Sequence, residues 1–278
     1  MPYLVLIIYL ALALLIQFFA GYFPVSFMAF PLNVMMFFLW LLVMSALWKY
    51  NRKSLFVRLM LSRETTISCI AVFVVMCLVI GLSGNRSLVQ TWPFVSFILY
   101  FQTVLLFVIF RGWREKTATG ERAGNIRWRF LLNHVGLLVA VASAFWGAPD
   151  SETLRLHVNT GTPVNEAYRM SGSRVRLPFE VILTDFSIET YENGVPSVYE
   201  AVVDIDGNMI RLKVNSPHTL SFKDDIYLVG HVKEDGGCIL QIVREPWKYG
   251  VMAGVVMMLI GAALLFIGGP RINHSNDD

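Results

Sequence analysis

The sequence predicts a membrane all-α bundle of about six transmembrane helices with an inserted extracytoplasmic antiparallel all-β domain, sandwich-like in form. Three observations predict this fold class. Six apolar runs of about 20 residues are each long enough to cross a bilayer core of ~30 Å. Between the fifth and sixth runs, apolar residues alternate with polar ones, which is typical of strands with one buried face. Acidic residues gather in this alternating segment, whereas basic residues gather in loops between the runs.

The apolar runs set the predicted boundaries. They are Tyr3–Phe23, Phe27–Trp48, Thr66–Leu82, Trp92–Phe110, Trp128–Gly147 and Tyr249–Gly268. Pro31 is tolerated because a helix accepts proline in its first turn. The first run has no Lys or Arg before it and is too long for a signal peptide, so we expect a retained helix. The chain then divides into two N-terminal helices (1–48), a three-helix region (49–147), a β domain (148–246) and a last helix with its tail (247–278).

Charge is unevenly distributed along the 278 residues, although the net charge is only +3 and 55% of the residues are hydrophobic. Residues 148–246 contain fifteen Asp/Glu and nine Lys/Arg. The loops at 49–63 and 111–129 hold eleven basic residues, whereas those at 21–26 and 83–91 hold one. The positive-inside rule therefore predicts a multi-pass protein of the cell (inner) membrane, with both termini cytoplasmic and the β domain periplasmic or extracytoplasmic. The basic excess indicates topology and not nucleic-acid binding.

Period-two alternation predicts the strands of the β domain. Apolar residues occupy every second position in three segments, 175–183, 199–205 and 210–214. Asp206-Gly207-Asn208 and Asp235-Gly236-Gly237 are hairpin turn signals between strands. We expect a small antiparallel sandwich or barrel with no helix of its own.

Most catalytic motifs are absent from the sequence. It has no nucleophile elbow, no Gly-rich phosphate loop and no His/Cys/Asp cluster at metal spacing. The three cysteines form no C-x-x-C pair and have no assigned role. We interpret Cys69 and Cys77 as small apolar packing residues and Cys238 as an isolated thiol in the β domain. Three histidines of the β domain lie far apart in sequence and are interpreted as surface or strand residues: His157, His218 and His231.

One ionisable side chain, His134, stands inside a predicted span. At 1.5 Å per residue it lies roughly 9 Å along the helix from Trp128, within the cytoplasmic leaflet. A neutral imidazole can ligate iron through one nitrogen while a hydrogen bond orients the other. Gly136, two residues on, leaves room for a flat macrocycle or a neighbouring helix. The alternative is a packing histidine paired with Asn133 or a backbone carbonyl, and the residues alone leave both interpretations open.

Five segments carry a family resemblance. They are Thr91-Trp92-Pro93-Phe94-Val95, Asn133-His134-Val135-Gly136-Leu137, Leu177-Pro178-Phe179 with Leu183–Tyr191, Val214-Asn215-Ser216-Pro217 with Ile226-Tyr227, and Arg244-Glu245-Pro246-Trp247. In this order, from Thr66 to the end, they resemble the ResB/CcsB family of cytochrome c biogenesis proteins. Two features depart from the family: Glu245-Pro246-Trp247 replaces its usual Asp-Pro-Gly, and a short β domain is preceded by two extra spans.

The resemblance implies haem as the cofactor, held by a complex that exports haem and presents it to apocytochrome c outside the cytoplasm. A CcsA-type membrane subunit supplies a Trp-rich WWD segment in such complexes, and this chain has none. The chain would thus be one subunit of a cytochrome c synthetase (haem lyase), not an enzyme by itself. Within that picture, the resemblance implies that His134 binds haem as a metal ligand in the bilayer.

Two other functions are alternatives to haem handling. One is a non-catalytic membrane scaffold whose β domain docks partner proteins, and it is distinguished by predicting no loss of haem when His134 is replaced. The other is a small-molecule transporter, which is disfavoured because the spans show neither internal repeats nor broken polar helices.

Overall fold

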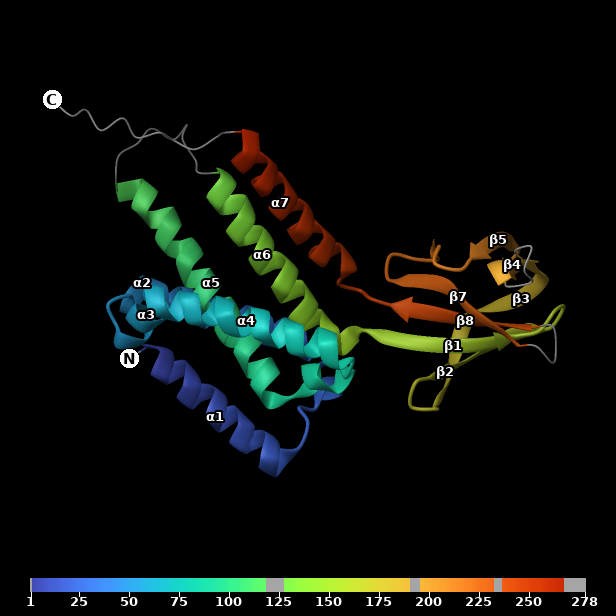
Figure 1. Ribbon diagram of the computed structural model, residues 1–278, viewed down its shortest axis with the longest axis horizontal. Helices are drawn as coiled ribbons and strands as arrows, with labels where there is room; N and C mark the ends of the chain where they lie inside the picture. Colours follow the sequence, from blue (N-terminus) through green and yellow to red (C-terminus); the bar gives the residue numbers. More distant parts are fainter. Residues whose placement is uncertain (1, 119–127, 191–195, 233–236, 268–278) are drawn as a thin grey trace. The chain divides into compact units, whose positions relative to one another are not determined.

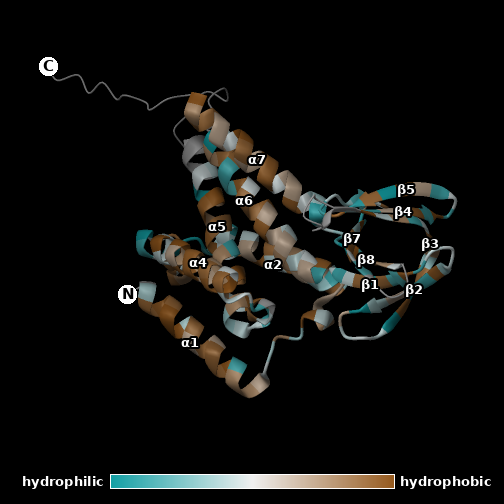
Figure 2. Ribbon diagram, turned by 45° about the vertical axis from the view of Figure 1, so that its right-hand side comes forward, coloured by the Kyte–Doolittle hydropathy of each residue, from teal (hydrophilic) through white to brown (hydrophobic). Residues whose placement is uncertain are grey.

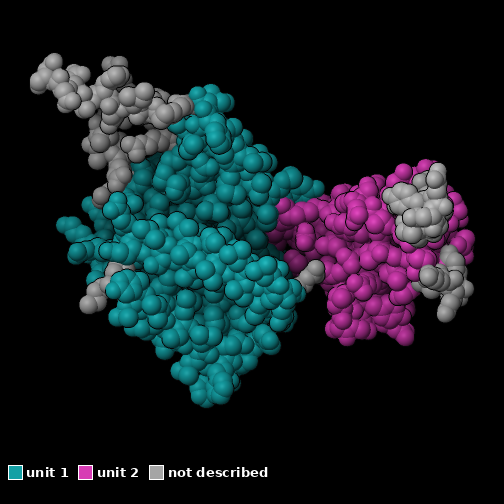
Figure 3. Space-filling model, viewed as in Figure 1, with its two compact units in different colours: residues 1–149, 249–278 teal, residues 150–248 magenta. Residues whose placement is uncertain are grey.

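A computed structural model describes residues 2–118, 128–190, 196–232 and 237–267 (Figure 1). The chain forms two compact units, residues 1–149 with 249–278 and residues 150–248, coloured separately in Figure 3. The first unit is helical and the second is built from strands. The finer division of the helical part at residue 48 stays a prediction.

Six helices of the described residues are long and apolar enough to cross a membrane, as the sequence predicts. They are α1 (Pro2–Ala20), α2 (Leu32–Asn51), α4 (Arg63–Ser83), α5 (Trp92–Ala118), α6 (Trp128–Gly147) and α7 (Lys248–Ile267). Hydrophobic residues dominate most of the length of these helices, whereas hydrophobic and hydrophilic residues are mixed along the strands (Figure 2).

The main differences from the predicted helices are at the start of α2, in the first basic loop and at the end of α5. α2 starts at Leu32 because Pro31 is its N-cap, and the residues before it form a 3₁₀ turn, η1 (Val25–Met28). A short helix, α3 (Leu55–Met60), lies within the first basic loop and is capped by Ser54, whose side chain accepts a hydrogen bond from Val57 N. α5 continues beyond Phe110 to Ala118, since the Arg, Glu and Lys that follow the apolar run are themselves good helix formers.

α5 lies at the centre of the helical unit. Phe97 and Phe107 on α5 are fully buried, and α1, α3, α4 and α6 contribute side chains to the same core. Polar links attach α1 to α5: the Tyr9 hydroxyl donates to Ser96 O at 3.1 Å, and Gln17 Oε1 accepts from Trp92 N at 2.9 Å. The first predicted span is therefore packed into the helical unit. Short 3₁₀ segments η2 (Arg86–Gln90) and η3 (Ala148–Asp150) precede α5 and follow α6.

The strands form one eight-stranded antiparallel sheet in the order β5-β4-β3-β2-β1-β8-β7-β6. They are β1 (Glu152–Val158), β2 (Pro163–Arg169), β3 (Arg174–Thr190), β4 (Pro196–Ile205), β5 (Asn208–Lys213), β6 (His218–Thr219), β7 (Asp224–Val232) and β8 (Gly237–Arg244). Asp206 (φ 50°) and Gly207 (φ 84°) alone connect β4 to β5, which is the two-residue turn that the sequence predicts. The second predicted turn, before Gly237, lies outside the described residues.

The sheet curls until its distant strands meet. β3 approaches β8 and β4 approaches β7, although other strands separate them in the hydrogen-bonding order. Val214, directly after β5, forms a parallel bridge with Leu228 of β7. An even number of antiparallel steps separates β5 from β7, so their parallel direction follows from the strand order. The fully buried core side chains, including Leu156, Leu183 and Leu240, lie inside this curl. Division into two packed sheets, the sandwich form, stays a prediction.

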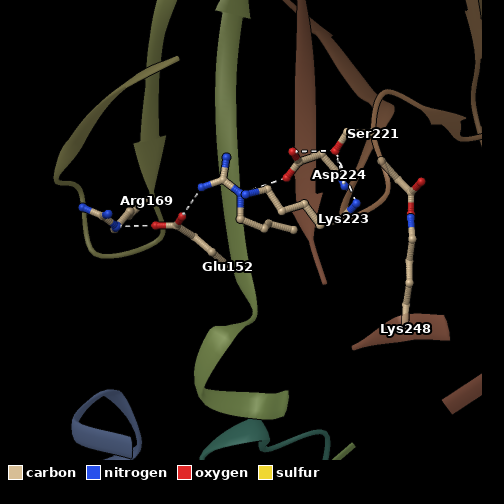
Figure 4. A network of polar contacts seen from close by, with 8 residues as sticks. Glu152, Arg169, Ser221, Lys223, Asp224 and Lys248 are labelled. Carbon is tan, nitrogen blue, oxygen red and sulfur yellow. Dashed lines mark hydrogen bonds and ion pairs between the residues drawn. The ribbon is translucent and has the colours of Figure 1, made fainter. Parts of the chain in front are cut away.

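Ion pairs join the ends of four neighbouring strands (Figure 4). Glu152, which begins β1, accepts hydrogen bonds from Arg169 of β2 and from Arg244, which ends β8. Arg244 Nε also donates to Asp224 Oδ1 at 2.8 Å, and Ser221 Oγ donates to Asp224 Oδ2 at 2.9 Å. Acidic and basic side chains therefore alternate across β2, β1, β8 and β7 where the chain enters and leaves the sheet.

Two further hydrogen bonds hold the chain in place directly after β8. Trp247 Nε1 donates to Asp150 Oδ2 at 2.8 Å, and Lys248 Nζ donates to Asp225 Oδ2 at 2.7 Å. Burial raises the pKa of Asp225, but hydrogen bonds from Lys248 and Thr219 and the charge of Lys248 outweigh it and hold the pKa below its ordinary value. Asp225 therefore stays ionised and paired at neutral pH.

Candidate functional site

His134 lies half-buried on α6, one turn after Phe130. Its Nδ1 is 2.9 Å from Phe130 O, and its ring stacks on the Phe130 ring with centroids 4.1 Å apart. A carbonyl oxygen can only accept a hydrogen bond, so this contact places the imidazole proton on Nδ1. Nε2 then carries the lone pair, and no hydrogen bond joins it to any residue in the described part of the chain.

A glycine on α5 positions the Phe130 ring. A Cβ added to Gly112 would lie 2.5 Å from Phe130 Cε1, so the ring fits there only because Gly112 has no side chain. Phe130 in turn supports the imidazole of His134 by stacking. The orientation of His134 is therefore fixed by its own helix and by the helix next to it.

The space beside Gly136 is filled by α7. A Cβ on Gly136 would lie 2.8 Å from Gly254 O, and a Cβ on Gly254 would lie 2.5 Å from Ala140 N. Asn133 packs against Gly261 in the same interface and donates from Nδ2 to Arg129 O, not to His134. The sequence left open whether Gly136 makes room for a macrocycle or for a neighbouring helix, and the structure supports the helix. It also left open whether His134 pairs with Asn133 or with a backbone carbonyl, and the structure supports the carbonyl.

Sequence reasoning missed a polar cluster on α2, α5 and α6. Asn33 Nδ2 donates to Trp146 O at 2.8 Å, and Trp146 Nε1 donates to Gln102 Oε1 at 3.2 Å. Trp40 Nε1 donates to Thr103 Oγ1 at 3.2 Å. Asn33 and Gln102 are fully buried, and Gln102 Nε2 has no hydrogen-bond partner among the residues that the structure describes. The sequence signal was present, because amides are rare within apolar spans and usually bind another helix.

The remaining candidate residues are scattered. No group of three or more His, Cys, Asp or Glu among the described residues could hold a metal ion. Cys69 and Cys238 are buried, and burial raises the pKa of the Cys238 thiol to about 12, which keeps it protonated and unreactive. In the β unit, His157 and His218 are exposed, whereas His231 is half-buried beside Tyr199.

The fold and this site define a class of protein: an apolar helical unit interrupted by a curled antiparallel sheet, with one oriented histidine inside an apolar helix. A comparison with protein families gives a more specific result. The model of the ResB-like family matches residues 107–239, from the middle of α5 into β8, and this region includes His134. The family resemblance predicted from the sequence is confirmed, over a shorter region than the one from Thr66 to the end. The match supports a role in cytochrome c biogenesis.

Other comparisons are more distant. No curated protein matches the chain. A solved structure, "Cytochrome c Heme Lyase CcmF", is similar with 16% identity and a TM-score of 0.37. The similarity covers 69% of this chain and 33% of that one, so the chain spans about a third of that protein's length. A TM-score of this size does not establish a shared fold.

Proposed function

We propose that the chain is a membrane subunit of a cytochrome c maturation complex, in which His134 helps to hold haem during its export and presentation to apocytochrome c. The observation that carries this proposal is the state of the His134 ring. Nδ1 is committed to Phe130 O at 2.9 Å, and Nε2 keeps a lone pair without a partner in the described part of the chain. This is the arrangement of a ligating histidine, whose second nitrogen donates to a carbonyl or carboxylate.

The chain's own residues would hold and orient this ligand. Phe130 O fixes the tautomer, the Phe130 ring supports the imidazole face, and Gly112 makes room for that ring. When bound, haem would supply an iron that a neutral imidazole nitrogen can coordinate. His134 would provide one ligand, and a CcsA-type partner would provide the other.

Placement in a lipid bilayer is supported by exposed apolar side chains. Phe18, Leu82 and Phe266 on three different helices are 82%, 85% and 83% exposed. Soluble proteins do not leave such extended apolar surfaces in water. The six apolar helices would therefore span the membrane, with the basic loops in the cytoplasm and the β unit outside.

A labelling experiment tests this orientation. Single cysteines at Asn51 and Thr119 should react with a membrane-impermeant maleimide only after the cells are permeabilised. Cysteines at Thr190 and Gly236 should react in intact cells. The unsubstituted protein gives the background from its own thiols. Labelling of the Asn51 variant in intact cells would contradict the proposed topology and, with it, haem presentation outside.

The haem proposal is tested with His134→Ala in the complex with its CcsA-type partner. We expect the mutant to insert normally, because removing an imidazole does not make the span less apolar. Haem retained per protein, measured as Soret absorbance, should fall at least severalfold. Added imidazole should restore part of the absorbance, since a small ligand can enter the vacated space.

Asn133→Ala is the matched control on the same helix. Asn133 packs against Gly261 but has no imidazole nitrogen that could coordinate iron. The variant should lose stability and keep its haem per folded protein. If His134→Ala and Asn133→Ala behave alike, and imidazole does nothing, His134 is a packing residue. The scaffold function would then be favoured, because it also accounts for the close packing of α6 on α7.

A further inference from the structure

Two turns at one end of the sheet carry exposed apolar side chains. Met170 directly follows β2 and is 66% exposed, and Phe222 lies in the turn before β7 and is 67% exposed. Both turns lie at the end of the sheet where β1 begins and β8 ends, because the ion pairs of Glu152 and Arg244 join β2 and β7 at that end (Figure 4). β1 and β8 lie between β2 and β7, so the two turns are about 14 Å apart across the sheet.

The turn at the opposite end of β1 and β2 differs in composition. It consists of residues 159–162, with the sequence Asn-Thr-Gly-Thr, and all four residues are exposed. Polar and small residues of this kind are usual for a turn in water. The phenylalanine and the methionine are therefore a feature of one end of the sheet, and they indicate that this end meets a less polar environment than water.

This end is also the one through which the chain enters and leaves the sheet. Residues 148–151 lie between the end of α6 and the start of β1, and residues 245–247 lie between the end of β8 and the start of α7. Such short connections span at most about 18 Å and 14 Å, respectively. Both helices have the length and hydropathy of membrane spans. When α6 and α7 cross a bilayer, this end of the sheet must therefore stay close to its surface.

An aromatic residue typical of membrane interfaces is fixed at the same end. Trp247 Nε1 donates to Asp150 Oδ2 at 2.8 Å, which joins the two connections to each other. Tryptophan is enriched where a membrane meets water, because its ring is apolar and its N–H is polar. Lys223, exposed directly after Phe222, has no ion pair among the residues that the structure describes. An aromatic ring beside a lysine suits this interface, since the ring can enter the apolar layer while the ammonium reaches the lipid phosphates.

We infer that this end of the sheet is inserted into the membrane–water interface, with Met170 and Phe222 among the upper parts of the lipid acyl chains. The bilayer is the occupant of this surface because the chain itself holds the surface beside it through two short connections. The inference rests on the membrane placement of α6 and α7 that is part of the proposed function. It adds a contact of the β unit with lipid to the covalent attachment of that unit to the two helices.

Fluorescence quenching by lipids measures this insertion. Met170→Cys and Phe222→Cys are made separately in the full chain with Cys77→Ala, which removes the exposed native thiol, whereas Cys69 and Cys238 are buried. An environment-sensitive fluorophore is attached to each cysteine. The protein is then reconstituted into phosphatidylcholine vesicles that contain lipids with a nitroxide near the top of the acyl chain. This nitroxide lies below the headgroups, so we expect it to quench both labels, because they are inserted and not merely tethered nearby.

Thr162→Cys is the matched control, because Thr162 is exposed in the turn at the opposite end of β1 and β2. The labels at Met170 and Phe222 should be quenched severalfold more strongly than this one. Leu259→Cys tests the placement of the helices separately, since Leu259 is 64% exposed on α7. Its label should be quenched by a nitroxide deep in the acyl chain. An unquenched Leu259 label would overturn the proposed membrane placement, and the inference with it.

The inference alone fails if the Leu259 label is quenched while the Met170 and Phe222 labels behave like the Thr162 label. A shift of the Phe222 label to shorter emission wavelength without lipid quenching also overturns it, because a protein, such as a second copy of the chain, would then cover this end. Phe222→Asp should lower the quenching of the Met170 label severalfold, since a carboxylate is costly below the headgroups. Unchanged quenching would show that Phe222 does not hold this end in lipid.

Discussion

Gly254→Ala is expected to destabilise the helical unit by about 3 kcal/mol, a large effect for one methyl group. The added Cβ would lie 2.5 Å from Ala140 N, 2.5 Å from Gly136 O and 2.8 Å from Ala140 Cα. All three are backbone atoms of α6, so no side chain can rotate away, and α7 must move as a whole. Titration of the detergent-solubilised protein with SDS, followed by circular dichroism, measures the loss.

Gly81→Ala on α4 is the control for this substitution. Nothing lies within 4 Å of a Cβ at Gly81, and the residue is also inside an apolar helix. Alanine has the better helix propensity, so this variant should be neutral or stabilised by up to about 1 kcal/mol. Equal effects of the two substitutions would show that helix propensity, and not the contact of α6 with α7, decides the stability.

Arg244→Ala is expected to destabilise the β unit by about 2–3 kcal/mol. Arg244 joins Glu152 and Asp224, and the side chain of Asp224 is only 11% exposed. Removing the guanidinium leaves that carboxylate inside the protein without its cation. The value lies below that of a fully buried pair because the Arg244 side chain is 27% exposed and water can enter.

Hydrogen exchange of the strand amides in the full chain measures this effect. A loss of 2–3 kcal/mol corresponds to exchange roughly 30- to 150-fold faster for amides that open with the whole sheet. Arg211→Ala is the control, because Arg211 forms an ion pair with Glu200 but its side chain is 69% exposed. Its cost should stay below about 1 kcal/mol. If Arg211→Ala accelerated exchange as much as Arg244→Ala, burial would not be the source of the effect.

Much of the fold follows from local patterns. The run Trp128–Gly147 coincides with α6, because apolar length alone decides such a helix. The Asp206–Gly207 turn was predictable since both residues accept positive φ. The closure of the sheet was not predictable in this way. The bridge between Val214 and Leu228 depends on the combined curl of several strands, which no single segment encodes.

The candidate site was predictable only in part. His134 was found because an ionisable residue in an apolar helix is costly and therefore informative. Its partner was not, since any carbonyl of the preceding turn or Asn133 could have served. The stacking of His231 on Tyr199 was not predictable either, because it depends on the β-bulge between Leu228 and Gly230 and on the curl of the sheet.

The hydrogen bond from Asn33 to Trp146 O has a consequence for biosynthesis. The two residues are 113 positions apart, so α2 is synthesised well before its partner exists. At roughly 5–20 residues per second, the delay is about 6–23 s. During that interval the Asn33 amide lacks this bond, and a polar group of this kind needs another hydrogen-bond partner, such as water. A chain that stops before Trp146 cannot form this hydrogen bond, so the bond links α2 to α6 only after α6 has been synthesised.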